Sequence, residues 1–383
     1  MKRRIRRHRR KGNILVLSAV MMVVMIAFVA FAVDIGYLYT CRNELQRSAD
    51  AAAIAAAWEL VDPDAPSGHG GPTAVSASAL EVAAQYAGLN PIGTESPDLA
   101  SDDVTVGFMA NPWLPDDTLL PASGATMPNA VQVRVQRTGV QNGEVPLFFA
   151  RILGFASAAA EAQATAALVT NIAGFRTPDD GSNLQILPFA LDEQTWLALT
   201  DGVGADNYRY NSDSETITSG PDGIQEVNLY PQGTGSPGNR GTVDIGGSNN
   251  STADISRQIV EGISPEDMEA LDDQDRSLEF NDSGELQLNG DTGISAGVKD
   301  DLTAIKGQPR IVPVFRTVIG PGNNAEYTIV KFIGVRVMDV KLTGSMSSKR
   351  LMVQPCNIVS KGGIPAPGAT TSTYIYSPVW LVR

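Results

Sequence analysis

The most regular hydrophobic pattern of the chain lies near its start. Residues 14–33 form an apolar run of twenty residues that contains one serine and no charged side chain. At about 1.5 Å of rise per residue, a helix of this length is roughly 30 Å long, which is the thickness of a bilayer core. The pattern therefore predicts a transmembrane helix over residues 14–33.

Directly after this run the apolar pattern becomes a helical stripe. Between Asp34 and Leu60, small and apolar residues recur at spacings of three and four, which places them on one face of an α-helix. The stripe consists of Leu38, Cys41, Leu45, Ala49, Ala52, Ala56 and Leu60. The Asp-Pro pair at 62–63 should end the helix, so one rod of about 70 Å is expected over residues 14–60. The stripe could pack into its own domain or on neighbouring subunits.

Shorter helix and strand patterns follow. Residues 74–88 predict a second helix, 104–108 and 130–136 predict strands, and 146–154 predict a short helical piece. Residues 160–170 are rich in alanine and fit either a helix or a strand.

Strand patterns dominate the second half of the chain. They lie at 310–319, 327–342, 349–355 and 373–382, after two short helices at 254–262 and 265–271. Ser264 should be the N-cap of the second short helix. Residues 200–255 are rich in Gly, Asn, Ser and Asp, and predict surface loops between short strands or partial disorder.

These patterns together predict an α+β fold. A transmembrane helix continues into an extracytoplasmic helix and a small α+β domain, and a mainly β C-terminal domain follows. The expected boundaries are a basic cytoplasmic tail at 1–13, the transmembrane helix at 14–33, the juxtamembrane helix and small domain at 34–172, and the mainly β domain at 175–383.

The charge distribution predicts how the chain is oriented. Residues 1–11 carry eight Lys or Arg, whereas the rest of the chain carries 21 basic and 42 acidic residues. The positive-inside bias then holds the N-terminus in the cytoplasm and places the body outside it. The acidic body would repel phosphates, which argues against nucleic acid as a partner. Ala30-Phe31-Ala32 also fits a signal-peptide cleavage site, which would release the body instead of anchoring it.

Residues suited to catalysis are scarce. The chain has two histidines, His8 and His69, and no cluster with metal-ligand spacing, so we expect no metal, no cofactor, no catalytic residue and no small-molecule substrate. Asp291-Thr292-Gly293 matches the aspartic-protease triplet, but Asn289-Gly290 precede it, which favours a turn. A hydrolase would need a second buried carboxylate beside Asp291.

Two further sets of residues leave alternatives open. Asp201, Asp206, Asp213 and Asp222 could hold a calcium ion, but without the D-x-D-x-D-G spacing they fit solvated turns better. Cys41 and Cys356 could form one disulfide if the body lies in an oxidising space.

Residues 10–60 resemble the N-terminal segment of the TadE/TadG-like proteins of tight-adherence (Flp) pilus systems. Three features carry the resemblance: Lys11-Gly12 before the span, a span that ends Ala32-Val33-Asp34-Ile35-Gly36, and the run Leu45-Gln46-Arg47-Ser48-Ala49-Asp50-Ala51-Ala52. The family-motif residues are Gly12, Asp34, Gly36, Leu45, Gln46, Ala49, Asp50, Ala51 and Ala52. A looser similarity extends to about residue 170 and favours a strand at 160–170.

The resemblance implies a non-enzymatic accessory component of pilus assembly or secretion. It would be a single-pass protein of the bacterial inner membrane whose partners are the lipid bilayer and other pilus-assembly membrane subunits. One departure argues against prepilin processing: the fifth residue after Gly12 is Leu17, where prepilins have Glu. The alternative is a secreted or surface-anchored adhesin or structural envelope protein.

Overall fold

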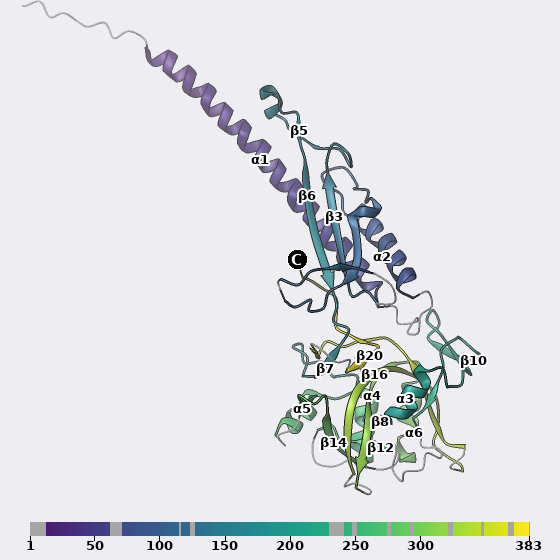
Figure 1. Cartoon of the computed structure of the whole chain (residues 1–383). Helices are drawn as coiled ribbons and strands as arrows, with labels where there is room; N and C mark the ends of the chain where they lie inside the picture. The colour runs from purple at the N-terminus through teal and green to yellow at the C-terminus, as the bar shows by residue number, and fades with distance from the viewer. Residues whose placement is uncertain are drawn as a thin grey trace, which may run out of the picture.

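The computed structural model describes residues 13–61, 71–114, 116–122, 127–229, 241–246, 251–273, 277–291, 295–320, 325–345, 348–366 and 371–382. Its dominant feature is α1 (Asn13–Trp58), one continuous helix whose first half projects from the body as a rod (Figure 1). The predicted single rod is therefore confirmed. Within the described ranges, α1 is the one helix long and apolar enough to cross a membrane, and none of its most apolar window is buried in the protein.

The second half of α1 is packed into a core. Leu45, Ala49, Ala52 and Ala56 are fully buried, and the core also contains alanines of α2 (Gly71–Gly88). Small side chains on both helices let the two backbones approach closely, so the helices exclude water without large residues. The stripe on α1 thus lies in the core of its own chain, which agrees with the first of its two interpretations.

A five-stranded antiparallel sheet covers this helix pair in the order β2-β1-β3-β6-β22. The strands are β1 (Val104–Phe108), β2 (Leu120–Pro121), β3 (Ala130–Arg137), β6 (Ala160–Ala167) and β22 (Trp380–Leu381). β1 and β3 confirm the predicted strands, and β6 shows that residues 160–167 form a strand. β22 comes from the far end of the described chain and places Trp380 opposite Ala167.

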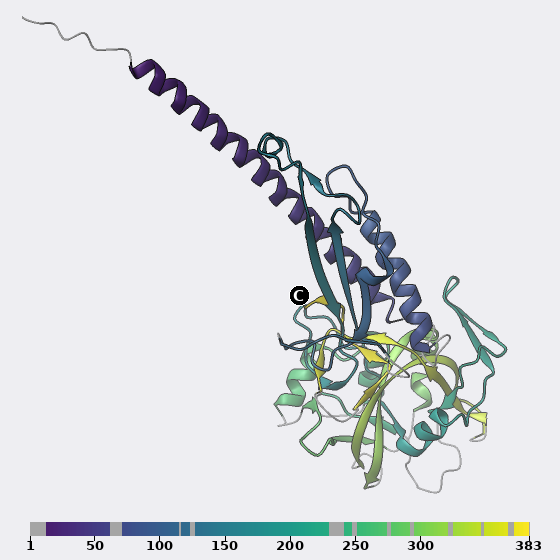
Figure 2. The ribbon, with the colours of Figure 1, turned by 45° about the horizontal axis from the view of Figure 1, so that its top comes forward.

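Between β3 and β6 the chain forms a narrow hairpin. β4 (Val145–Pro146) pairs with β5 (Ser157–Ala158), and the 3-10 helix η2 (Ala150–Leu153) lies between them. Residues 147–155 are called the tip below. Figures 1 and 2 both show the tip beyond the end of the sheet, alongside α1. The short helical piece predicted at 146–154 is thus a 3-10 turn.

The second half of the chain is mainly β, as predicted, and its largest sheet closes on itself. The order is β11-β17-β16-β14-β12-β8-β15, and β15 pairs with β16 as well as with β8. Five strands therefore form a ring: β16 (Ala325–Lys341), β14 (Leu286–Asp291), β12 (Gly241–Val243), β8 (Phe189–Asp192) and β15 (Pro309–Ile319). Closure leaves these strands without a free edge.

The ring requires close contact between backbones at one position. A Cβ added to Gly241 would lie 1.9 Å from the carbonyl oxygen of Asp291 on β14 and 2.5 Å from the hydroxyl of Tyr327. Only glycine fits at this site, since neither the backbone carbonyl nor the buried ring can move away cheaply.

Smaller elements surround the ring. Strands β11 (Val227–Asn228), β17 (Arg350–Pro355) and β20 (Ser372–Thr373) extend its sheet, and β7 (Ile172–Phe175), β13 (Leu278–Glu279) and β19 (Gly363–Pro365) form a separate one. Two two-stranded sheets are β9 (Tyr208–Asn211) with β10 (Thr216–Ser219), and β18 (Ile358–Val359) with β21 (Ile375–Tyr376). The helical elements are η1 (Ser101–Asp103), α3 (Glu193–Thr200), α4 (Thr252–Glu261), α5 (Pro265–Asp272), η3 (Ala296–Val298) and α6 (Lys299–Ala304).

Of these later elements, the sequence predicted α4, α5 and β17. Ser264 caps α5 in a capping box with Asp267, as predicted for its N-cap. The single strand predicted at 373–382 is wrong, because β20, β21 and β22 divide the segment. Tyr374 has a φ of 63°, a left-handed conformation that a continuous strand does not allow.

Candidate functional site

Asp34 fastens the tip to α1. Its carboxylate accepts backbone N–H bonds from Phe148 (2.8 Å), Phe149 (3.0 Å) and Ala150 (2.6 Å), and the residue is only 4% exposed. Burial acts to raise the pKa of Asp34, but the N–H groups of Ala150, Phe148 and Phe149 outweigh it, so the pKa lies below its ordinary value. The carboxylate is therefore ionised at neutral pH and holds three donors that are 114 to 116 residues away in the sequence.

An aromatic contact strengthens the same junction. The rings of Tyr37 and Phe148 meet edge to face with centroids 5.2 Å apart. Tyr37 lies one helical turn beyond Asp34, so one face of α1 provides both the anionic and the aromatic contact. The sequence marked Asp34 as a motif residue but gave no sign of Phe148, Phe149 or Ala150 as its partners.

The other motif residues have different surroundings. Leu45, Ala49 and Ala52 are buried in the core shared with α2, and Ala51 is half-buried. The Gln46 side chain donates to Asp50 (2.8 Å) and to the backbone carbonyl of Gln163 on β6 (3.2 Å), so it ties helix to sheet. Gly36 is exposed, and a Cβ there would meet nothing within 4 Å. Gly12 lies outside the described residues.

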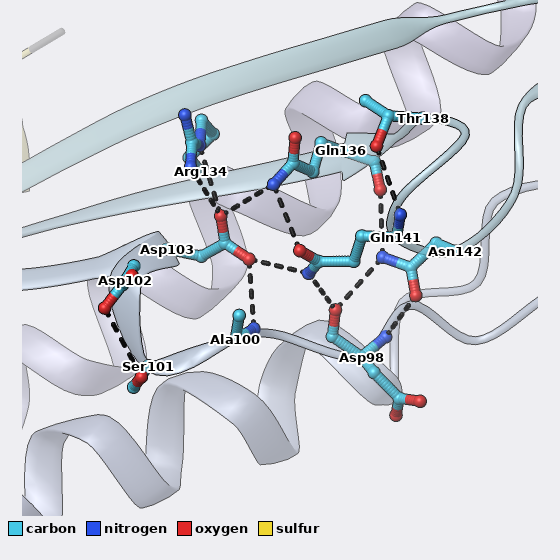
Figure 3. A network of polar contacts seen from close by, with 10 residues as sticks. All are labelled: Asp98, Ala100, Ser101, Asp102, Asp103, Arg134, Gln136, Thr138, Gln141 and Asn142. Atoms are coloured by element: carbon cyan, nitrogen blue, oxygen red, sulfur yellow. Dashed lines mark hydrogen bonds and ion pairs between the residues drawn. The ribbon is translucent and has the colours of Figure 1, made fainter.

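A buried polar cluster centred on Asp103 was not predicted (Figure 3). Its carboxylate accepts bonds from Arg134, Gln136, Gln141 (2.6 Å) and the N–H of Ala100 (3.0 Å). Burial acts to raise the pKa of Asp103, but the bonds from Gln141, Ala100 and Arg134 outweigh it and lower the pKa below the ordinary value. With these donors around it the carboxylate has a structural role: it joins the start of β1 to β3 and the turn after it.

Replacing Asp103 with Asn is expected to lower the free energy of unfolding by roughly 2 kcal/mol at neutral pH, because an amide group then faces other donors. A lowered pKa means that the stabilisation is present above about pH 4 and is lost as the pH falls through the folded-state value. The difference between the two proteins, measured by urea unfolding, should therefore shrink at pH 3. Asp102→Asn is the matched control, because its exposed carboxyl accepts one bond, from Ser101. Equal effects of the two variants would contradict the assignment.

The remaining chemical candidates are described only in part. Asp206 accepts N–H bonds from Asp222 (2.9 Å) and Gly223 (3.0 Å), which is a turn role. Asp291 ends β14, and the other two residues of the triplet, 292 and 293, lie outside the described residues. In the part of the chain that the structure describes, no group of three or more His, Cys, Asp or Glu is placed to hold a metal ion. Cys41 on α1 and Cys356 after β17, both described, form no disulfide.

Two known protein families match the part of the chain that contains α1, α2 and strands β1 to β6. The Tad model, for Flp pilus-assembly TadE/G-like proteins, matches residues 12–59, and the Tad_C model, for Tad-like Flp pilus-assembly proteins, matches residues 55–166. The N-terminal segment is thus similar to the TadE/G-like proteins over residues 12–59. The resemblance stated from the motif residues is thereby confirmed. Searches of curated proteins and of solved structures each returned no match.

The two family matches together cover one structural part of the chain. They run from the start of α1 almost to the end of β6, so they cover the helix pair, strands β1 to β6, Asp34 and the tip. The closed ring of strands and β22 lie beyond them. The matched part of the chain therefore comprises the helix that carries the apolar rod and the helix and sheet packed on its second half.

Proposed function

We propose that this protein is a membrane-anchored, non-catalytic component of a tight-adherence (Flp-type) pilus assembly or secretion system. The family matches over residues 12–166 support a role related to pilus assembly, and that is the observation on which the proposal rests. Proteins of these families act in assembly, so the chain would work by binding and positioning other subunits.

The projecting half of α1 supports anchoring. Its side chains between Ile14 and Val33 are mostly exposed, although nearly all of them are apolar. A soluble protein does not leave such a rod in water, whereas a bilayer would cover it. The eight cations before the span would keep the N-terminus in the cytoplasm of the bacterial inner membrane, with the body outside.

A division of the chain into two domains is part of the proposal. We infer that residues 34–172 form a membrane-proximal domain, to whose sheet β22 is added, and that the rest of residues 175–383 forms a second, mainly β domain that contacts envelope or pilus partners. The alanine stripe of α1 is occupied by α2 and the first sheet, so it is not free to bind other subunits. Membrane partners would instead contact the exposed side chains of the predicted span, residues 14–33.

Genetic replacement would test the proposal. In a pilus-forming bacterium that makes this protein, deletion of its gene should abolish pili. Expression of the full-length protein in the deletion strain should restore them. A version with residues 34–383 exported behind a cleavable signal peptide should not restore them, because it lacks the anchor. Normal piliation in the deletion strain would refute the assembly role. Restoration by the secreted body, or a native N-terminus at Val33, would instead support the alternative of a secreted structural protein.

A further inference from the structure

The tip of the β4–β5 hairpin exposes an unusual set of side chains. Of residues 147–155, Ile152 is 81% exposed, Leu153 78% and Phe155 66%, and both Phe148 and Phe149 are exposed as well. These residues follow one another on a short hairpin, so they form a contiguous apolar surface. Soluble proteins rarely keep such a surface in water, and it marks a site of contact with a partner or a membrane.

The tip lies beside the predicted transmembrane segment. A groove of about 330 Å³ runs between them, and its walls come from both elements. It is lined by Val23, Ile26, Ala27, Ala30, Phe31 and Asp34 of α1, and by Phe149, Ala150, Ile152 and Leu153 of the tip. The span from Val23 to Val33 is about 15 Å along a helix axis, half the thickness of a bilayer core. If residues 14–33 cross the membrane, the tip must enter the same half of it.

Most of the backbone N–H groups of the tip have hydrogen-bond acceptors within the protein. Every polar backbone group in hydrocarbon needs a partner within the protein. The N–H groups of Phe148, Phe149 and Ala150 donate to Asp34. Four others have carbonyl acceptors within the hairpin: those of Leu147, Ile152, Gly154 and Phe155. The hydrogen bonds of the 3-10 turn and of the Asp34 carboxylate therefore lower the free-energy cost of moving this apolar loop from water into hydrocarbon.

The charge of the hairpin fits a lipid environment. Between residues 145 and 160 the one ionisable side chain is Arg151, and Glu144 and Glu161 flank the segment on the side of the sheet. Arg151 is exposed, and its long side chain can extend to lipid phosphates while the neighbouring apolar groups stay in hydrocarbon. An acidic group at the tip would oppose insertion, and this segment has none.

We propose that the tip, residues 147–155, is embedded in the extracytoplasmic leaflet and that acyl chains of the same bilayer fill the groove beside α1. This inference rests on the membrane anchoring proposed above. It gives the protein a second membrane contact, which fixes how the first sheet is tilted and rotated about the helix. Asp34 then acts as the clamp that holds the two membrane-embedded elements together at the membrane surface.

Depth-dependent quenching tests the proposal in the full-length chain. Single cysteines are introduced as Ile152→Cys, as Phe28→Cys within the span, and as Val203→Cys on the distal body, and are labelled with an environment-sensitive nitrobenzoxadiazole dye. Native Cys41 and Cys356 are fully buried and will not react in the folded protein. Each labelled protein is reconstituted into phosphatidylethanolamine–phosphatidylglycerol vesicles that contain acyl-chain nitroxide lipids.

The expected result is that dyes at positions 152 and 28 lose most of their emission to the nitroxide lipids, and the dye at 203 keeps it. A quenched dye at 28 with an unquenched dye at 152 would overturn the tip proposal and leave the anchor intact. If neither dye is quenched, anchoring itself fails. Disulfide formation between two copies through Cys at position 152, together with loss of quenching, would show that a second protein copy occupies the groove and would also overturn the proposal.

Discussion

Replacing Asp34 with Ala is expected to free the tip from α1 and to raise amide hydrogen exchange at Phe148, Phe149 and Ala150 by roughly 10- to 100-fold. The variant removes the carboxylate to which all three N–H groups donate. Hydrogen exchange measured by mass spectrometry on the full-length protein in nanodiscs gives the result directly. The helix pair should keep its own protection, because its core does not include Asp34.

Asp50→Ala is the matched control for this variant. Asp50 lies on the same helix and its carboxylate accepts a bond from the side chain of Gln46, with no contact to the tip. We expect unchanged exchange at residues 147–155 in this control. Unchanged exchange in Asp34→Ala would contradict the clamp. Since the pKa of Asp34 is lowered, the clamp should stay closed at neutral and mildly acidic pH and open only as the pH falls below about 4.

Replacing Phe332 with Ala is expected to lower the free energy of unfolding by roughly 3–5 kcal/mol. Phe332 on β16 is fully buried and meets the rings of Phe175 (4.9 Å) and Phe280 (5.2 Å). Removing its ring leaves a cavity where three aromatic groups from β16, β7 and the segment after β13 converge. Urea unfolding, followed by tryptophan fluorescence and hydrogen exchange, measures the change.

Phe332→Leu serves as the control, since it keeps most of the volume and should cost less than about 1.5 kcal/mol. The same experiment tests the proposed domain division. If residues 175–383 are a domain, Phe332→Ala should raise exchange in the ring of strands and leave residues 45–57 of α1 protected. A uniform loss of protection over both parts would contradict separate domains.

Long periodic segments were predictable from sequence because their signals are local. The apolar run and the alanine stripe defined α1 to within two residues at each end, and the valine alternation in 130–136 defined β3. For residues 160–167 the composition was ambiguous. Pairing with β3 makes this segment a strand, because its hydrogen-bond partners lie across the sheet and not along a helix.

Contacts between distant residues were not predictable. The clamp joins Asp34 to a loop more than 100 residues away, and the Asp103 cluster collects donors from three separate segments. No spacing rule predicts contacts between such residues from a single sequence, since each contact depends on how the first sheet packs on α1. The closure of the strand ring, which depends on Gly241 fitting beside Asp291, has the same cause.

In the topology proposed above, the pairing of β22 with β6 sets an order of events for export. β6 leaves the translocation machinery early, while its neighbour β22 follows more than 200 residues later, and the N–H of Val169 must also wait for Ser377 across 208 residues. Until then, β6 presents an unpaired edge beside the membrane, the kind of edge on which other strands readily add. In that topology the first sheet becomes complete only after the ring of strands has left the translocation machinery, because β22 follows the ring in the sequence.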